Sequence, residues 1–185
     1  MDNGASSYRR FREEGDASGL AEIIRDYKDG LILYLSSLVG DVRTAEELAE
    51  DTFVLLGTKK PRDKGKSSFR TWLYRIGHNV AVDYLRRTRK GDVPLDECAE
   101  LTDEERDLEA SYLRDERKQA VHHALRQLKP EYRQALWLIY FEGFSCQEAA
   151  TVLKKSVHSV ETLLYRARNA LRLQLQSEGF EYEDQ

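Results

Sequence analysis

The feature that most constrains this fold is the stretch from Phe144 to Arg168, which is typical of two short helices joined by a tight turn. Ser145 is followed three residues later by Glu148, the spacing of a capping box in which each side chain binds a backbone N–H left free at a helix start. Ser156 offers a second N-cap further along the chain. The pattern therefore predicts a helix-turn-helix whose helices begin at Ser145 and Ser156.

The second of these helices separates apolar from polar side chains. Spacing of three and four residues predicts an apolar inner face and an outer face of polar and basic groups that suits a DNA major groove. Taken alone, the segment leaves open an ordinary helical hairpin with solvated arginines. The inner set is Val160, Leu163, Leu164, Ala167 and Leu171, and the outer set is His158, Ser159, Thr162, Tyr165, Arg166 and Asn169.

The net charge of −4 conceals basic and acidic blocks along the chain. Residues 57–91 hold 11 basic and 2 acidic side chains, and residues 118–177 hold 9 and 4, whereas residues 92–117 between them hold 3 and 11. Two basic modules favour two contacts with a polyanion, because neutralisation of phosphates drives nucleic-acid affinity. The acidic parts would repel DNA or meet a basic protein partner.

Composition favours an all-α protein of two small domains. Over 185 residues the chain is 34% charged and has few Gly and Pro residues, which is typical of a soluble helical protein. The start of the chain does not resemble a signal peptide, and no apolar run approaches the ~20 residues of a membrane helix. We therefore expect a cytoplasmic protein without membrane insertion. The two cysteines, Cys98 and Cys146, lack the spacing of a disulfide framework or a zinc site.

Two helices are predicted near the start of the first domain. Apolar residues at helical spacing from Leu20 to Leu38 predict one amphipathic helix, or two that abut near Gly30. Thr44 with Glu47 predicts a capping box that opens the next helix.

A basic loop and a long helix complete this domain. Residues 57–67 combine Gly and Pro with five cations, and Ser68 can cap a helix from Phe69 to about Arg89. The loop and helix pair cations with aromatic rings such as Trp72, a combination that can hold single-stranded DNA, since rings stack on exposed bases at ~1–3 kcal/mol each. Trp72 as an ordinary core residue, and the loop as an ordinary solvated loop, are the alternatives.

The second domain is predicted to hold about four helices. Leu113–Leu128 and Glu131–Phe141 precede the helix-turn-helix, with Pro130 between them. The expected division of the chain is a tail at 1–19, a first domain of three to four helices at 20–90, an acidic linker at 91–112, a four-helix domain at 113–176 and an acidic tail at 177–185.

The sequence carries no pattern of catalysis. None of the four histidines has metal-type spacing or lies beside a Gly-flanked nucleophile, and no Gly-rich phosphate loop is present. We therefore expect no enzyme activity, no catalytic residues, no metal, no cofactor and no small-molecule substrate.

The order of these motifs resembles the extracytoplasmic-function (ECF) group of bacterial RNA polymerase sigma factors, over about Leu20 to Leu175. The core-binding segment of that family resembles TAEELAEDTFVLL, its promoter-melting helix resembles SSFRTWLYRIGHNVAVDYLRR, and its carboxy-terminal DNA-binding domain resembles LRQLKPEYRQALWLIYFEGFSCQEAATVLKKSVHSVETLLYRARNAL. The resemblance implies a subunit that binds core RNA polymerase and promoter DNA, with an anti-sigma factor as a further partner.

The resemblance also implies roles for individual residues. In that family one minus-ten base is flipped into a pocket under the loop, which here is residues 60–67. Implied for core-polymerase binding are Glu47, Leu48, Asp51, Thr52 and Phe53; for the minus-ten element Lys60, Lys64, Lys66, Arg70, Trp72, Arg75, Asn79, Arg86 and Arg87; and for the minus-thirty-five element Ser156, His158, Ser159, Thr162, Tyr165, Arg166 and Arg168.

The sequence departs from the family pattern at several positions. Glu50 stands where Gln is usual, Lys154 where a turn Gly is common, and Glu161 and Leu163 where Lys and Arg are frequent. Because the second helix has fewer cations, we expect it to bind DNA phosphates more weakly.

Two other functions are alternatives to a sigma factor. A stand-alone helix-turn-helix regulator usually dimerises and needs no melting helix, so it leaves the Trp72 helix without a purpose. An enzyme with an unusual helical site would need a cluster of perturbed titratable groups.

Overall fold

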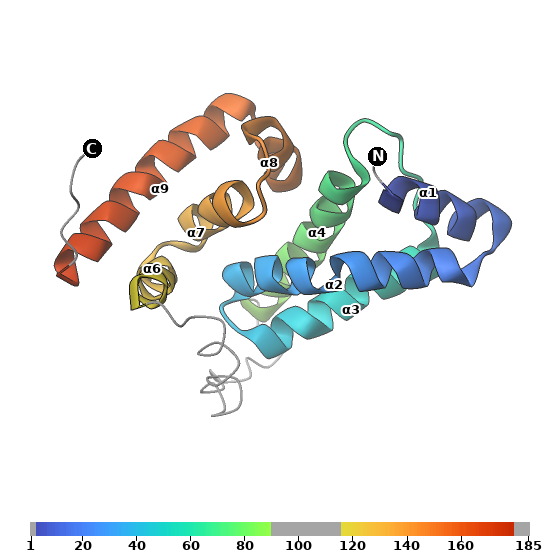
Figure 1. Ribbon diagram of the computed structural model, residues 1–185, viewed down its shortest axis with the longest axis horizontal. Helices are drawn as coiled ribbons and strands as arrows, with labels where there is room; N and C mark the ends of the chain where they lie inside the picture. Colours follow the sequence, from blue (N-terminus) through green and yellow to red (C-terminus); the bar gives the residue numbers. More distant parts are fainter. Residues whose placement is uncertain (1–2, 90–115, 180–185) are drawn as a thin grey trace.

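The structure, a computed structural model, describes residues 3–89 and 116–179, and these form α-helices without strands (Figure 1). The predicted all-α class is confirmed for these residues. The expected linker at 91–112, most of the tail at 177–185, Leu113 and Cys98 lie outside the described residues. The first domain holds α1 (Asn3–Arg9), the π-helical turn η1 (Arg10–Glu14), α2 (Ala17–Val39), α3 (Val42–Lys59) and α4 (Phe69–Arg89); the second holds α6 (Glu116–Gln127), α7 (Pro130–Leu136), the π-helical turn η2 (Trp137–Phe141), α8 (Cys146–Leu153) and α9 (Val157–Ser177).

The central helix of the first domain, α2, is continuous. Asp16 caps it by accepting a bond from the Ser18 N–H, and Gly40 ends it in a left-handed conformation. Of the two predicted forms, one helix or two abutting at Gly30, the structure has one. Gly30 allows another helix to approach closely, because a Cβ there would lie 2.6 Å from the Tyr74 hydroxyl.

Helix α3 begins earlier than predicted. Asp41 is the N-cap, and its carboxylate accepts a bond of 2.7 Å from the Thr44 N–H. The predicted capping box of Thr44 and Glu47 is therefore wrong, because Thr44 already lies in the first turn. The helix runs to Lys59, three residues into the predicted loop, and ends at Lys60 with φ 44°.

Helix α4 has the predicted bounds. The Ser68 hydroxyl accepts a bond of 3.1 Å from the Thr71 N–H, which is the expected N-cap contact. Leu73 and Ala81 are fully buried on its inner face. We call the segment between α3 and α4, residues 60–68, the basic loop.

The first residues of the chain differ from the expected tail. Residues 3–14 are helical, and Tyr8 and Phe11 are buried against the rest of the domain. Two apolar rings in an otherwise polar segment are too few for helical periodicity to be visible, so only tertiary packing reveals the element. The tail prediction for residues 1–19 therefore does not describe residues 3–19.

The helix-turn-helix has the predicted capping. Ser145 and Glu148 form a complete capping box, and the Ser156 hydroxyl accepts a bond of 3.1 Å from the Ser159 N–H. The turn between them contains Lys154 with φ 54°, the left-handed conformation that favours glycine. The predicted helix Glu131–Phe141 is instead α7 followed by η2.

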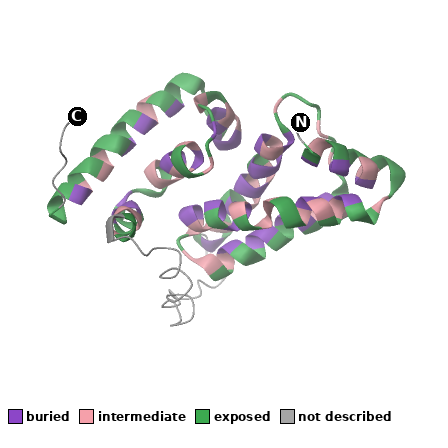
Figure 2. Ribbon diagram, in the orientation of Figure 1, coloured by how far each residue is buried: buried purple, intermediate pink, exposed green. Residues whose placement is uncertain are grey.

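The two domains lie against one another. Helix α4 packs along α8, and α2 packs along α7 (Figure 1). Buried residues follow the faces of α2 and α4 and recur on α7 and α8 (Figure 2). A single hydrophobic cluster runs through both domains. The arrangement therefore brings the long helix of the first domain beside the helix-turn-helix of the second.

The conformation of Lys154 gives a testable stability difference. Lys154→Gly and Lys154→Ala both remove the charge, but only glycine adopts φ 54° without a Cβ clash. We expect the glycine variant to have a free energy of unfolding about 1 kcal/mol higher than the alanine variant, measured by urea denaturation. Equal stabilities, or a more stable alanine variant, would contradict the left-handed turn.

Candidate nucleic-acid interface

Helix α4 and the basic loop expose most of the cations predicted to contact DNA. Side chains exposed to solvent are Lys60, Lys64, Lys66, Arg75, Arg86 and Arg87, and Asn79 is half-buried. Arg86 is paired with Asp83 at 2.9 Å within the same helix, a solvent-exposed pair that costs little to break. These groups can therefore track phosphates without rearrangement of the core.

Trp72 lies partly in the core and partly at the surface. Its ring packs against Phe69 at 5.5 Å and Tyr8 at 5.2 Å between centroids, yet the side chain is only half-buried. The inner part of the indole thus belongs to an aromatic cluster, and the remainder is accessible in the first turn of α4, next to the basic loop.

Arg70 contacts the second domain. Its guanidinium donates to the Glu142 carboxylate at 2.5 Å and to the Glu142 carbonyl at 2.8 Å, and it lies 4.5 Å from the centre of the Phe144 ring. The Tyr74 hydroxyl donates to the same carboxylate at 2.8 Å. In this arrangement the predicted minus-ten contact from Arg70 is engaged within the protein.

Glu142 was missed by the sequence analysis, although its side chain is only 9% exposed. A buried carboxylate is costly unless it is paired and hydrogen-bonded, and Arg70 and Tyr74 supply both. Burial is the largest cause that raises the pKa of the Tyr74 hydroxyl above its ordinary value, and the charge of Glu142 is the second. The hydroxyl therefore keeps its proton and remains a donor. The sequence signal that could have identified Glu142 is that it is a lone acidic residue, directly after an apolar run and within a basic module.

Two further bonds join the domains. The Arg133 guanidinium of α7 donates to the Ser37 carbonyl at 2.5 Å, and burial lowers the pKa of Arg133 from its ordinary value. The Thr71 hydroxyl donates to the Glu148 carboxylate at 3.3 Å, so the capping box of the helix-turn-helix also contacts α4.

His78 lies in the packed part of α4. Its Nδ1 is 2.9 Å from the Tyr34 hydroxyl. Burial lowers the pKa of His78 to about 4, and the charges of Lys154 and Lys155 in the second domain contribute in the same direction. The imidazole is therefore neutral at pH 7.

Helix α3 exposes only part of the segment predicted to bind polymerase. Glu47 and Asp51 are exposed, whereas Leu48, Thr52 and Phe53 are 3%, 0% and 6% exposed. These three side chains fill the core of the first domain, so they are not accessible to a partner in this conformation, and their role in polymerase binding stays a prediction. The outer face instead adds Glu46, Glu50 and the 60% exposed Val54.

Helix α9 presents the predicted outer face. Val160, Leu164 and Ala167 are buried, which turns the opposite side outward. The exposed side chains are Ser156, His158, Ser159, Tyr165, Arg166 and Arg168, with Thr162 half-buried. The Ser156 hydroxyl is engaged in the cap, and the Arg168 guanidinium lies 5.7 Å from the centre of the Tyr140 ring.

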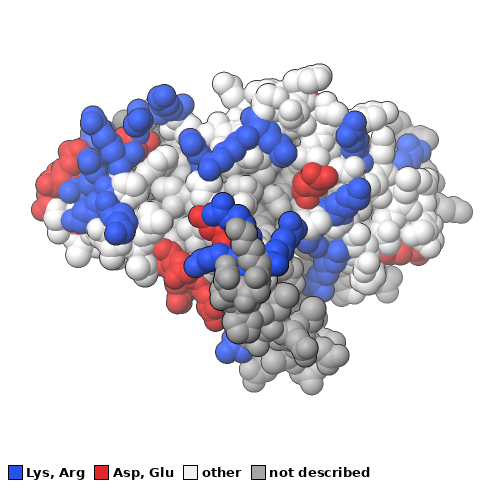
Figure 3. Space-filling model, turned by 180° about the vertical axis from the view of Figure 1, so that it is seen from behind, with Lys and Arg blue, Asp and Glu red and all other residues white. Residues whose placement is uncertain are grey.

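Charge is distributed unevenly over the surface. Seen from behind, Lys and Arg side chains lie at the end of the molecule that carries α1 and the basic loop, with acidic side chains among them, and also across the middle of this face (Figure 3). Over residues 3–89 and 116–179, no group of three or more His, Cys, Asp or Glu side chains could hold a metal ion. None of the helices in these residues is long and apolar enough to cross a lipid bilayer.

Comparison with known proteins assigns both domains. Residues 23–91 match sigma-70 region 2, and residues 118–171 match sigma-70 region 4. The chain belongs to the ECF family of RNA polymerase sigma factors. It directs polymerase to specific promoters for transcription initiation, as a non-catalytic subunit. A stand-alone regulator is set aside, because region 2 accounts for the whole first domain apart from its amino-terminal helices.

Several named relatives cover nearly the whole chain. RNA polymerase sigma-H factor of Pseudomonas aeruginosa is 32% identical over 173 residues, 89% of this chain and 90% of that protein. ECF RNA polymerase sigma factor SigW of Bacillus subtilis is 29% identical over 175 residues, 88% of this chain and 92% of that protein.

Two solved structures share the fold. The sigma factor RpoE in complex with the anti-sigma factor NepR from Bartonella quintana has a TM-score of 0.63 at 22% identity, covering 84% of this chain and 96% of that chain. CnrH in complex with the cytosolic domain of CnrY has a TM-score of 0.66 at 24% identity, covering 95% and 96%.

Replacing Glu142 tests the contact between the domains. Glu142→Gln keeps the size of the side chain and removes its charge, so Arg70 loses its ion pair. We expect domain docking to weaken by about 1–3 kcal/mol, because Arg70 is partly exposed. Small-angle X-ray scattering should then report a larger radius of gyration, whereas the exposed control Glu131→Gln should leave it unchanged. Identical scattering for both variants would contradict this role of Glu142.

His78 predicts a loss of stability on acidification. The unfolded imidazole binds a proton near pH 6.5 and the folded one only near pH 4, so stability is complete above pH 6.5 and falls as the pH drops toward 4. The loss is up to about 3 kcal/mol. Urea denaturation at pH 7.5 and 4.5 should show a smaller loss for His78→Gln than for the wild type. Parallel pH dependence would contradict the depressed pKa.

Proposed function

We propose that the sigma factor divides promoter recognition between α4 with the basic loop, which hold the minus-ten element, and α9, which reads the minus-thirty-five element. The observation that carries this assignment is the presence of a separate exposed basic surface on each domain, each on a helix whose other face is buried. The contacts on α4 suit a melted strand, because cations lie beside an accessible indole. Those on α9 suit a duplex groove.

Within the minus-ten surface, we assign selection of one flipped base to the basic loop. Lys64 and Lys66 are exposed there, and Trp72 lies where the loop enters α4. Unstacking a base costs a few kcal/mol, which stacking and phosphate contacts in such a pocket can recover.

Polymerase would bind on the outer face of α3. Glu47 and Asp51 project there with Glu46, Glu50 and Val54, so the surface is acidic with one apolar side chain. A basic groove on the partner would complement it. Because core polymerase acts in the cytoplasm, we place the protein there as well.

Both promoter elements can be reached only if the domains separate. Elements 25 base pairs apart lie roughly 85 Å apart at about 3.4 Å per pair. In the packed arrangement, α4 and α8 are within hydrogen-bonding distance at Thr71 and Glu148. The 26 residues at 90–115 can span at most about 90 Å when extended. Opening would also release Arg70 for DNA.

An anti-sigma factor is a further proposed partner. Two solved structures of similar fold are complexes of RpoE with the anti-sigma factor NepR and of CnrH with the cytosolic domain of CnrY. A partner that binds both domains at once would hold them together and keep α4 away from DNA.

Run-off transcription tests the assignment. Purified protein and core polymerase would be incubated with a library of genomic fragments, using the wild type, Arg166→Ala and the control Arg25→Ala, which removes an exposed arginine from α2. We expect discrete start sites that require the protein, with Arg166→Ala weaker by about 5- to 100-fold, since a base contact contributes ~1–3 kcal/mol. Equal output from both variants would contradict the role of α9, and a wild type without start sites would contradict promoter recognition itself.

A further inference from the structure

The amino-terminal helices contact the basic loop directly. The Tyr8 hydroxyl donates to the Pro61 carbonyl at 2.7 Å, and the Arg12 guanidinium donates to the Lys60 carbonyl at 3.2 Å. The Lys60 ammonium in turn lies 4.7 Å from the centre of the Phe11 ring. Three contacts from α1 and η1 therefore converge on the first two residues of the loop.

These first two residues decide the direction in which the loop leaves α3. Lys60 adopts φ 44°, which costs a non-glycine residue about 1–2 kcal/mol, and Pro61 has a fixed φ of its own. Bonds to both carbonyls offset that cost. Burial raises the pKa of Tyr8 to about 12, so its hydroxyl keeps the proton that it donates.

The same helix also contacts the other end of the loop. The Tyr8 ring lies 5.7 Å from Phe69 and 5.2 Å from Trp72 between centroids, and these residues begin α4. Tyr8 thus joins the exit of α3 to the entrance of α4, and the loop runs between them.

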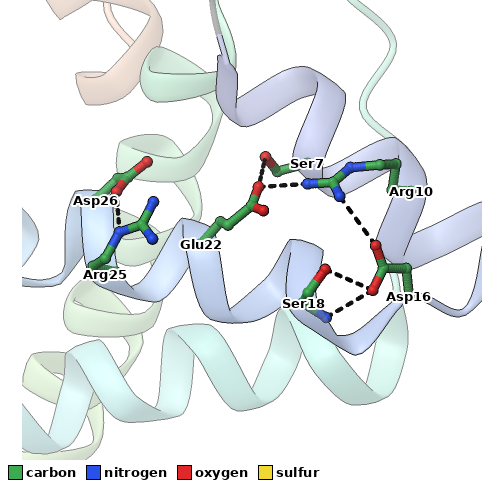
Figure 4. A network of polar contacts seen from close by, with 7 residues as sticks. All are labelled: Ser7, Arg10, Asp16, Ser18, Glu22, Arg25 and Asp26. Carbon is green, nitrogen blue, oxygen red and sulfur yellow. Dashed lines mark hydrogen bonds and ion pairs between the residues drawn. The ribbon is translucent and has the colours of Figure 1, made fainter.

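Polar contacts hold this amino-terminal segment firmly on α2 (Figure 4). The Arg10 guanidinium contacts both Asp16 and Glu22, and the Ser7 hydroxyl donates to Glu22 at 2.6 Å. The backbones approach closely, because a Cβ on Gly19 would lie 2.2 Å from the Ser7 carbonyl oxygen. The segment therefore has a fixed position from which to orient the loop.

We propose that Tyr8 and Arg12 are positioning residues for base selection in the minus-ten element, acting by fixing the course of the basic loop. This inference rests on the proposed role of the loop. Neither residue needs to contact DNA. Loss of either bond would let the loop vary in conformation and so reduce its selectivity for one base. The cations that hold phosphates would remain in place.

Transcription from promoter libraries with a randomised minus-ten element tests the proposal. Tyr8→Phe removes one hydroxyl and keeps the packed ring, and Arg12→Gln removes the guanidinium; Tyr132→Phe in α7 and the exposed Arg9→Gln in α1 are matched controls. A variant with residues 62–67 replaced by Gly and Ser identifies the promoter position that the loop reads.

We expect Tyr8→Phe and Arg12→Gln to reduce base preference at that position at least fivefold and to leave preference elsewhere unchanged, with no further effect in the loop-replaced background. A uniform fall in output at all positions would mean a structural role only and would overturn the proposal, as would an unchanged profile. A wild type without start sites, or a loop-replaced variant with the wild-type profile, would instead contradict the proposed function.

Discussion

The buried carboxylate of Glu142 is the interaction on which the arrangement of the two domains depends. A charge in this position requires partners, and both come from α4: the guanidinium of Arg70 and the hydroxyl of Tyr74. The partners fix the register of α4 against the start of the helix-turn-helix. The neighbouring contacts, Phe144 on Tyr74 and Glu148 on Thr71, are then within reach.

Three sets of side chains on helix α4 have different surroundings. Leu73 and Ala81 fill the core of the first domain, and Arg70 and Tyr74 contact the second domain. The basic side chains towards its end, such as Arg86, remain in solvent. Arg70 belongs to the interdomain contact and also to the predicted DNA surface. If it contacts the minus-ten element as proposed, docking of the domains and binding of that element would compete for one guanidinium.

In the second domain, Glu148 likewise makes two different contacts. Glu148 caps α8 and also accepts a bond from Thr71 of α4. Separation of the domains would therefore release the start of the helix-turn-helix without unfolding it, because the Ser145 contacts of the capping box are local.

Local signals were sufficient for much of this fold, and tertiary ones were not visible in the sequence. The caps at Ser145 and Ser156 and the start of α4 at Ser68 follow from contacts within one turn, so they could be predicted. The N-cap of α3 is Asp41 and not the predicted Thr44. Both residue types can cap a helix, so only the course of the backbone decides which of them does so. The amino-terminal helix and Glu142 depend on partners distant in the sequence, which apolar periodicity does not encode.

Site-specific photo-crosslinking in the holoenzyme tests the central claim, that α4 with its loop and α9 contact different promoter elements. A photoreactive phenylalanine analogue would replace Lys64 or Tyr165, both exposed, in protein assembled with core polymerase on a mapped promoter. We predict crosslinks from position 64 to the minus-ten element and from position 165 to duplex DNA at the minus-thirty-five element. Crosslinks from both positions to the same element, or from neither to DNA, would contradict the account.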